Sequence, residues 1–434
     1  MGLRIFTYPS DKGEKFLQKL INRAEEFPEK IEKEVKKIGK EVLKKGDRAL
    51  KEFTKKFDGV LIEDFKVSEE EIEKAYEEVS EELLEAIRYG IERIRSFHEK
   101  GKPESWFEWK DGIFRGQVVR AVERAGLYIP GGKGGETPLI STVLMTAVPA
   151  KIAGVEKVVM VSPPRKEGGL HPALLVAGKE AGVDEIYKVG GPWSIFALAY
   201  GTESIPKVDV ICGPGNIYVT VAKKLVSAFT GIDIIAGPSE VLIVADESAD
   251  PEFVVWDLFA QAEHDPMSLP LLITTSEELA KEVKELAEKL VKEVPRKEIV
   301  ESALFKKGGI FVVEDIEKAI ELANLIAPEH LELMVKEPVE ALGLVKNAGA
   351  VFLGSYTPEA MGDYIAGPNH VLPTMGFARF CSSLSVDKFL KKVNFLKYSE
   401  EALLKDAEKV MLLAEKENLF CHAEAVRVRV KKLK

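Results

Sequence analysis

The sequence predicts an α/β protein with mainly parallel sheets, because short β-rich runs alternate with helical stretches from Ala125 onward. One of the intervening helices is expected around residues 172–181. The length of 434 residues exceeds one ordinary core, so we expect two large domains with smaller appendages. The candidate strands are residues 125–129, 157–161, 185–189 and 208–212.

Helical segments are expected on both sides of this region. Residues 10–100 are rich in Lys and Glu, and their apolar residues recur every three or four positions, which is typical of amphipathic helices. A second stretch of strands and helices begins near Ile232 and continues past Phe352. The chain returns to charged helices from Ser399 to Lys434. We therefore expect helical appendages at both ends of the chain.

Composition and charge exclude several classes of protein. The net charge of −10 disfavours nucleic acid and anionic membranes as partners. No run of about 18 apolar residues occurs, so no membrane-spanning helix is expected. Cys212, Cys381 and Cys421 form no CxxC pair, which argues against a disulfide framework and a thiolate zinc site. The N-terminus lacks the apolar stretch of a signal peptide, so a cytoplasmic location is expected.

Three glycine-rich turns follow candidate strands. Ligands of open α/β sheets bind outside the carboxyl ends of strands, where glycine lets a backbone approach a phosphate closely. None of the three matches G-x-G-x-x-G, so each is also consistent with an ordinary tight turn. The turns are Tyr128-Ile-Pro-Gly-Gly132, Gly190-Gly-Pro-Trp193 and Gly213-Pro-Gly-Asn216.

A possible metal site begins in the segment Gln261-Ala-Glu-His264-Asp-Pro266. Asp250 and Pro251 form a helix start, and Pro266 is expected to stop that helix. Gln261 and His264, three residues apart, would project from one side and could share a cation. A plain helix end explains the same pattern.

An adjacent carboxylate and imidazole occur at Glu329–His330, after Pro328. This pair suits proton transfer, since histidine titrates near neutrality. Pro328 can end one helix and begin another, and an acidic residue in a helix's first turn is the alternative explanation.

Two further segments carry polar residues that could join such a site. Asp363 and His370 lie in an expected loop shaped by two glycines and a proline, and Glu417 and His422 lie in the terminal helices. Carboxylate and imidazole ligands without a thiolate suit a catalytic rather than a structural zinc. An ordinary loop and a solvated helix face remain the alternatives.

These motifs, in this order, resemble the histidinol dehydrogenase family over nearly the whole chain. The matching stretches are GDRALKEFTKKFDG, GLYIPGG, PLISTVLMTAVPAKIAGV, ALAYGTESIPKVDVICGPGN, GIDIIAGPSEVLIVAD, DLFAQAEHDP, APEHLEL, GAVFLGSYTPEAMGDYIAGPNHVLPT and HAEAV.

The resemblance implies two Rossmann-like parallel-sheet domains with helical N- and C-terminal appendages. It also implies oxidation of L-histidinol through L-histidinal to L-histidine, the last step of histidine biosynthesis, with NAD and one zinc ion per site. A homodimer is implied, in which Glu417 and His422 cross the interface. The expected boundaries are 1–30 for an N-terminal helical segment, 31–126 plus 239–383 for a domain carrying most zinc and acid–base residues, 127–238 for an NAD-side domain, and 384–434 for a C-terminal helical segment.

The family's site residues map onto this chain by motif. Glu329 and His330 correspond to the acid–base pair. The expected zinc ligands, which also contact substrate, are Gln261, His264, Asp363 and His422. Further expected substrate contacts are Ser239, His330, His370 and Glu417, and the expected NAD contacts are Tyr128, Trp193 and Asn216.

Two departures from the family pattern fall on the expected cofactor side. Trp193 stands where the family commonly has a glutamine that contacts NAD, and the loop PGGKGGETPL is longer than usual. A related zinc- and NAD-dependent dehydrogenase acting on another small polar alcohol is therefore the nearest alternative. A zinc hydrolase that uses Glu329 to activate water and a non-catalytic binding protein are the alternatives from other classes.

Overall fold

The computed structural model describes residues 2–23, 29–132 and 135–434. Residues 133–134 of the longer glycine loop lie outside the described residues. Contacts divide the chain into two compact units, Met1–Gly101 with Val122–Phe389, and Lys102–Ala121 with Leu390–Lys434.

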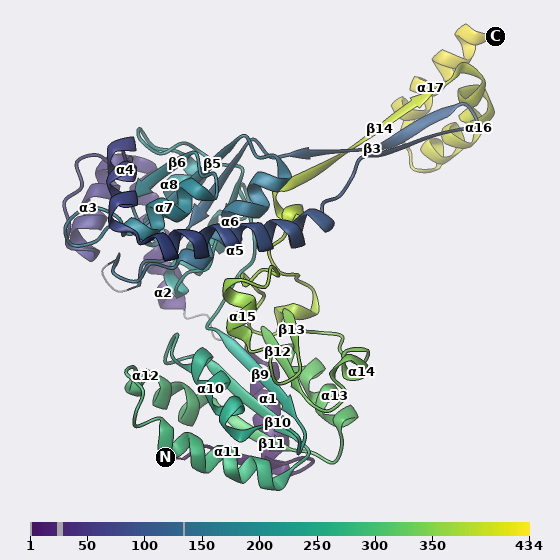
Figure 1. The fold of residues 1–434 in the computed structure, drawn as a ribbon. Helices are drawn as coiled ribbons and strands as arrows, with labels where there is room; N and C mark the ends of the chain where they lie inside the picture. Colours follow the sequence, from purple (N-terminus) through teal and green to yellow (C-terminus); the bar gives the residue numbers. More distant parts are fainter. Residues whose placement is uncertain (1, 24–28, 133–134) are drawn as a thin grey trace. The chain divides into compact units, whose positions relative to one another are not determined.

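The first unit contains a six-stranded sheet, here called sheet A, whose strands all run parallel (Figure 1). Alternate residues of the central strand β9 (Glu240–Ala245) point to opposite faces of the sheet. Val241 and Ile243 pack into the hydrophobic core on one face, and Leu242 and Val244 pack into the core on the other. Helices α10 (Pro251–Ala262) and α11 (Glu277–Leu290) cover the first face, and α1 (Asp11–Ile21) and α13 (Ile316–Ile326) cover the second. The strand order is β1 (Ile5–Thr7), β11 (Gly309–Val312), β10 (Leu269–Thr274), β9 (Glu240–Ala245), β12 (His330–Met334) and β13 (Ala350–Leu353).

The same unit contains a five-stranded parallel sheet, sheet B. Its strand order is β6 (Glu185–Lys188), β5 (Lys157–Ser162), β4 (Arg124–Tyr128), β7 (Val210–Cys212) and β8 (Gly231–Ile232). The helices between these strands are α6 (Ile140–Ala153), α7 (Pro172–Glu180), α8 (Gly191–Tyr200) and α9 (Ile217–Val226). The strands and helices are rich in fully buried apolar residues, which is typical of a parallel sheet covered on both faces.

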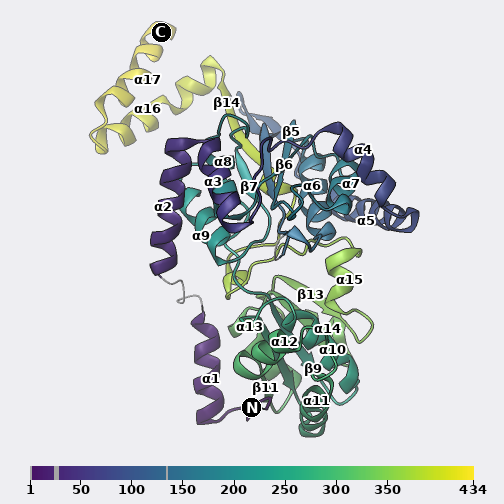
Figure 2. The same ribbon diagram turned by 90° about the vertical axis from the view of Figure 1, so that its left-hand side faces the viewer.

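The amphipathic helices of the N-terminal quarter pack on the helices of sheet B. Helix α2 contacts α8 and α9, α4 contacts α7, and α5 contacts α6, and Figure 2 shows α2 beside α9. The expected boundaries grouped residues 31–126 with 239–383, whereas these contacts join the helices to sheet B. Their bounds are α2 (Glu29–Lys45), α3 (Asp47–Phe57), α4 (Glu69–Glu78) and α5 (Glu81–Lys100).

The second unit is a three-stranded antiparallel sheet followed by two helices. Strands β2 (Trp106–Lys110) and β3 (Ile113–Ala121) form a hairpin, and β14 (Leu390–Tyr398) pairs with β3. Helices α16 (Glu400–Lys416) and α17 (Phe420–Leu433) complete the unit.

The predicted α/β class with parallel sheets is confirmed. The four candidate strands correspond to β4 to β7, and the expected helix corresponds to α7. Strand β1 lies in a segment expected to be helical, and β14 lies in another. The hairpin of β2 and β3 was also missed, although Asp111-Gly112, both at positive φ, is a hairpin-turn signal between two aromatic-rich runs.

No helix in the described ranges is long and apolar enough to span a membrane.

The chain path brings opposite ends of the two parallel sheets together. Strand β8 ends sheet B, and residues 233–239 lead directly into the amino end of β9 in sheet A. The carboxyl edge of sheet B and the amino edge of sheet A are therefore joined by one short connection. The predicted site residues of the first unit gather along these two edges.

Candidate functional site

The candidate acid–base pair lies at the amino edge of sheet A. His330 is the first residue of β12 and is in register with Val241, next to Glu240 at the start of β9. Ligands of open α/β sheets usually bind at the carboxyl ends of strands, whereas this candidate pair lies at the amino edge. In sheet B, the glycine-rich turns follow β4, β6 and β7 and therefore lie at the carboxyl edge.

The local structure around Glu329 differs from the prediction. Helix α13 ends at Ile326, and Ala327 caps it in the left-handed conformation with φ +51°. Pro328 could have begun another helix, which was the alternative explanation of Glu329, but a buried strand begins at His330. The short apolar run after His330 therefore joins the parallel sheet, because tertiary packing decides such short segments.

The backbone of Glu240 holds both members of the pair. Its N–H donates to Glu329 Oε2 at 2.8 Å, and its carbonyl oxygen accepts from His330 Nδ1 at 2.9 Å. Because a carbonyl only accepts, Nδ1 carries the proton and Nε2 is left as the basic nitrogen of the neutral imidazole. Glu329 Oε2 lies 3.5 Å from Nδ1 of His330.

Burial and negative charge act on this pair together. Burial raises the pKa of Glu329 and by itself lowers the pKa of His330. The Glu329 carboxylate, followed by Asp363 and Glu359, outweighs burial and raises the pKa of His330 well above its usual value. A cation bound among these carboxylates would counteract their negative charge.

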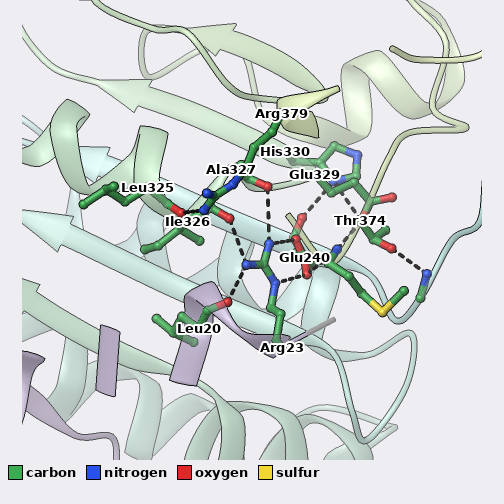
Figure 3. A network of polar contacts seen from close by, with 12 residues as sticks. Leu20, Arg23, Glu240, Leu325, Ile326, Ala327, Glu329, His330, Thr374 and Arg379 are labelled. Atoms are coloured by element: carbon green, nitrogen blue, oxygen red, sulfur yellow. Dashed lines mark hydrogen bonds and ion pairs between the residues drawn. The ribbon is translucent and has the colours of Figure 1, made fainter. Parts of the chain in front are cut away.

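Glu240 is itself fixed by a buried ion pair, which sequence reasoning missed. Arg23 Nε lies 2.6 Å from Glu240 Oε1, and Arg23 Nη2 lies 2.7 Å from Oε2. The same guanidinium donates to the carbonyl oxygens of Leu20, Ile326 and Ala327 (Figure 3). Nothing in the sequence spacing links Arg23 to Glu240, which lies 217 positions away.

Gln261 and His264 adopt a different arrangement from the one predicted. Asp250 and Pro251 start α10 as expected, but the helix ends at Ala262, before Pro266. Gln261 is therefore helical and buried, whereas His264 is exposed in the following turn. Their backbones remain joined, since His264 N–H donates to the Gln261 carbonyl at 3.3 Å.

The side-chain amide of Gln261 has a fixed orientation. Its Nε2 donates to a carboxylate oxygen of Glu359 and lies 3.2 Å from His330 Nδ1. Its Oε1 is buried and has no hydrogen-bond partner among the described residues. The amide nitrogen is thus held by Glu359, and the oxygen is free to accept or to bind a cation.

Asp363 approaches the other nitrogen of His330, with Oδ1 and Nε2 3.5 Å apart. It lies on the short helix α15 (Glu359–Tyr364) rather than in the expected loop. His370 Nδ1 donates to the Asp363 backbone carbonyl at 3.0 Å, and His370 Nε2 lies 3.4 Å from the Thr142 hydroxyl of α6. These contacts place Asp363 and His370 beside the acid–base pair.

Three further acidic side chains near the pair were missed in the sequence. Glu332 Oε1 accepts from the Glu359 backbone N–H at 2.9 Å, and Asp257 lies against the Glu332 carboxyl. Burial raises the pKa of Glu359 to about 8 and that of Asp257 to about 6. Glu332 is in the motif APEHLEL, where alternation along a strand would have placed it on the same face as His330.

The side chains around His330 fit a metal ion, although they do not form a ready-made cluster in the described part of the chain. Among the described residues, no three His, Cys, Asp or Glu side chains converge as a metal site. One expected ligand is a glutamine, which is outside these types, and another lies in the second unit. The buried oxygens Oε1 of Gln261 and Oδ1 of Asp363 lack hydrogen-bond partners in the described ranges, and such oxygens suit a cation.

His264 lies close enough to Asp363 to interact with its carboxylate electrostatically. Although much of the residue is exposed, partial burial of the imidazole lowers the pKa of His264, and the Asp363 carboxylate opposes that shift. A lowered pKa favours the neutral imidazole that binds metal ions. Ser239 immediately precedes Glu240, and its backbone carbonyl accepts from Leu269 N–H at 2.9 Å.

Glu417 and His422 belong to the second unit and are both exposed. Glu417 caps the carboxyl end of α16, and His422 lies in the first turn of α17. Between them, Asn418 adopts φ +59° and turns the chain. The first unit thus brings together Gln261, His264, Glu329, His330, Asp363 and His370, while these two residues are held on a separate unit.

The expected cofactor residues lie at the carboxyl edge of sheet B. Tyr128 ends β4 and is buried, and Asn216 caps α9 after β7. Trp193 lies in α8 with only 4% of its surface exposed, and its ring stacks on Phe53 and Phe57 at 5.8 and 5.3 Å. The ring is packed in the core, so little of its surface is available to a ligand. A direct contact between Trp193 and NAD stays a prediction.

The chain is similar to known proteins over nearly its whole length. The histidinol dehydrogenase sequence family matches residues 21–430. A histidinol dehydrogenase of Carboxydothermus hydrogenoformans is 52% identical over 412 residues, covering 94% of this chain and 96% of that protein. One from Bacillus cereus is 52% identical over 378 residues, covering 87% of each chain. The crystal structure of histidinol dehydrogenase from Elizabethkingia anophelis superposes with a TM-score of 0.93 at 39% identity, covering 99% of this chain and 98% of that one.

Fold, site and comparisons together define an α/β oxidoreductase with a buried Glu–His pair at the amino edge of a parallel sheet. More specifically, the chain belongs to the histidinol dehydrogenase family.

Proposed function

We propose that this enzyme oxidises L-histidinol to L-histidine through L-histidinal in two NAD-dependent steps, assisted by one zinc ion. One observation carries the proposal: next to Glu329, three buried polar atoms have no hydrogen-bond partner in the described ranges. They are Oε1 of Gln261, Nε2 of His330 and Oδ1 of Asp363. Buried polar atoms are rarely left unpaired, so they point to a polar ligand and a cation.

The zinc ion would be held by Gln261, His264 and Asp363 of the first unit, with His422 as the fourth ligand. When bound, it would anchor the amine and imidazole of the substrate and so fix the position of its alcohol carbon. The amide of Gln261 is turned correctly for this role, since Glu359 holds its nitrogen.

His330 acts as the base of both oxidations. Its Nδ1 proton is engaged by the Glu240 carbonyl, so the Nε2 lone pair accepts the proton of the alcohol hydroxyl. The carbon-bound hydrogen leaves as hydride to the nicotinamide, which yields the aldehyde and a protonated His330. The aldehyde must then be hydrated before a second hydride can leave.

Glu329 activates the water that hydrates the aldehyde. Its carboxylate is buried, and burial raises its pKa, which makes it a stronger base than an exposed glutamate. One carboxylate oxygen is held by the Glu240 N–H, so the other can take a proton from water. His330 must then release to solvent the proton that it took in the first oxidation, and its Nε2 accepts the hydroxyl proton of the hydrated aldehyde in the second oxidation.

NAD would lie along the carboxyl edge of sheet B, against Tyr128, Asn216 and the glycine-rich turns. This edge is joined to the acid–base edge of sheet A through residues 233–239. Ser239 and His370 are proposed substrate contacts. Ser239 directly precedes Glu240, and His370 donates a hydrogen bond to the backbone carbonyl of Asp363.

The complete site is proposed to form in a cytoplasmic homodimer, with Glu417 and His422 supplied by the partner copy. Large apolar side chains of the second unit remain exposed, which favours a protein partner for this unit. They include Phe107 at 72%, Leu396 at 64%, Leu413 at 65% and Phe420 at 68% exposed.

The proposal is tested by following NAD reduction with histidinol before and after removal of metal by a chelator. NADH formation that is lost with the chelator and restored by zinc would support it. Metal-independent reduction would overturn the zinc assignment, and absence of any NADH formation would overturn the whole proposal. Because Trp193 replaces a glutamine, other small polar alcohols are compared in the same assay, and a higher kcat/KM for one of them would favour the related-dehydrogenase alternative.

A further inference from the structure

A buried ion pair lies directly beneath the glycine-rich turn that follows β7. Lys223 of α9 and Asp233, just after β8, form this pair, and their side chains are only 3% and 0% exposed. A buried ion pair gains little net stability over well-packed apolar residues, because both charges lose their water. Its presence here therefore calls for a specific role.

Both charges are bonded to the backbone of one residue, Gly213. Lys223 Nζ donates to the Gly213 carbonyl at 2.9 Å, and Gly213 N–H donates to Asp233 Oδ2 at 2.7 Å. The second oxygen of Asp233 accepts from the Ile234 N–H at 2.7 Å. The ion pair thus fixes Gly213 through both its carbonyl and its N–H.

Gly213 connects the two expected cofactor contacts. Gly213 has φ +119°, and a side-chain Cβ there would lie 2.1 Å from the Tyr128 carbonyl oxygen. The turn therefore packs against the backbone of Tyr128. Three residues later Asn216 begins α9, and its Oδ1 accepts from the N–H groups of Tyr218 and Val219 at 3.1 and 3.2 Å.

We propose that Lys223 and Asp233 are positioning residues for the dinucleotide. By holding Gly213 against Tyr128, they keep the Gly213–Asn216 turn in the conformation that receives the cofactor. This inference rests on the proposed binding of NAD at this edge. Neither side chain touches the cofactor, so the expected effect is on NAD affinity rather than on the chemical steps.

The main test replaces both charges with apolar residues of similar size, in Lys223→Met/Asp233→Leu. This variant leaves no unpaired buried charge, so it is expected to fold. The dissociation constant and KM for NAD should rise by about tenfold or more, while zinc content, KM for histidinol and kcat at saturating NAD stay near wild type. A folded double variant with wild-type NAD affinity would show that the pair is only structural and would overturn the proposal.

A control variant separates positioning from general loss of stability. Leu175 is buried in α7, outside the Gly213–Asn216 turn, so Leu175→Ala should lower the melting temperature with little change in NAD affinity. If Leu175→Ala weakened NAD binding as much as the double variant at equal loss of melting temperature, the proposal would fail.

The unmodified enzyme gives a reading that does not depend on a variant's folding. Saturating NAD should slow hydrogen exchange at the amides of Gly213 and Ile234, since both are bonded to Asp233. Unchanged exchange in the presence of bound NAD would contradict the proposal. If the wild-type enzyme bound no NAD at all, the proposed function itself would have failed.

Discussion

Arg23 binds the Glu240 carboxylate in a bidentate ion pair, in which Nε lies 2.6 Å from Oε1 and Nη2 lies 2.7 Å from Oε2. The backbone of the same glutamate bonds to Glu329 through its N–H and to His330 through its carbonyl. The N-terminal segment therefore supports the proposed acid–base pair through one residue, Glu240. This arrangement connects the proposed acid–base pair to an ion pair that is almost wholly buried.

Arg23→Met should destabilise the protein and slow the reaction. Removing one partner leaves the Glu240 carboxylate buried without its counter-charge, which costs about 3–5 kcal/mol. The loosened Glu240 backbone should lower kcat, while KM for NAD stays near wild type because sheet B is untouched. Denaturant unfolding and steady-state kinetics check both parts. Arg88→Met is the matched control, since the Arg88 side chain lies at the surface, where an ion pair such as that with Glu180 contributes little to stability. Equal losses in the two variants would contradict a special role for Arg23.

Glu359→Leu should weaken metal binding. Without the carboxylate, the Gln261 amide loses the acceptor that orients it, and its oxygen is no longer directed at the metal position. Loss of such a supporting contact typically lowers metal affinity by about 10- to 100-fold. Zinc retention is measured by competition with a chelator. Glu359→Gln keeps an accepting oxygen and should lose less, so equal zinc affinity in the Leu and Gln variants would refute this orienting role.

His330→Asn and Glu329→Gln should affect the two oxidations differently. His330→Asn should slow oxidation of both histidinol and histidinal, by about 10²- to 10⁴-fold, because the base is missing from each. Glu329→Gln should mainly slow histidinal oxidation, because hydration of the aldehyde loses its base. Single-turnover NADH formation from each substrate separates the steps. Equal losses of both half-reactions in both variants would contradict the separate roles of His330 and Glu329.

Stability should decrease below neutral pH because of His98 on α5. Burial lowers the pKa of His98 to about 4, and its Nε2 has no hydrogen-bond partner among the described residues. The unfolded chain, with a pKa near 6.5, binds the proton more tightly than the folded protein does. Stability is therefore lost as pH falls from about 6.5 to about 4, by about 3 kcal/mol in total. His98→Leu should flatten the melting temperature across this pH range; a variant as acid-sensitive as wild type would exclude His98 as the cause.

The sequence by itself determined the fold class and most elements of sheet B. Buried parallel strands leave continuous apolar runs, and strands β4 to β7 were recognisable from such runs and the turns that follow them. Motif order also assigned the family and the expected roles of Glu329 and His330. Local chemistry was sufficient at the start of α10, where Asp250 and Pro251 act within one turn.

Only the tertiary structure decided how the site is supported. Whether the residues after Pro328 form a helix or a strand depended on pairing with β9, which no local pattern reveals. Arg23 and Glu240, like Gln261 and Glu359, are far apart in sequence and meet because parallel strands bring distant segments to one edge. The Glu329–His330 pair could be read from adjacent residues, whereas the groups that hold and orient it are long-range contacts created by folding.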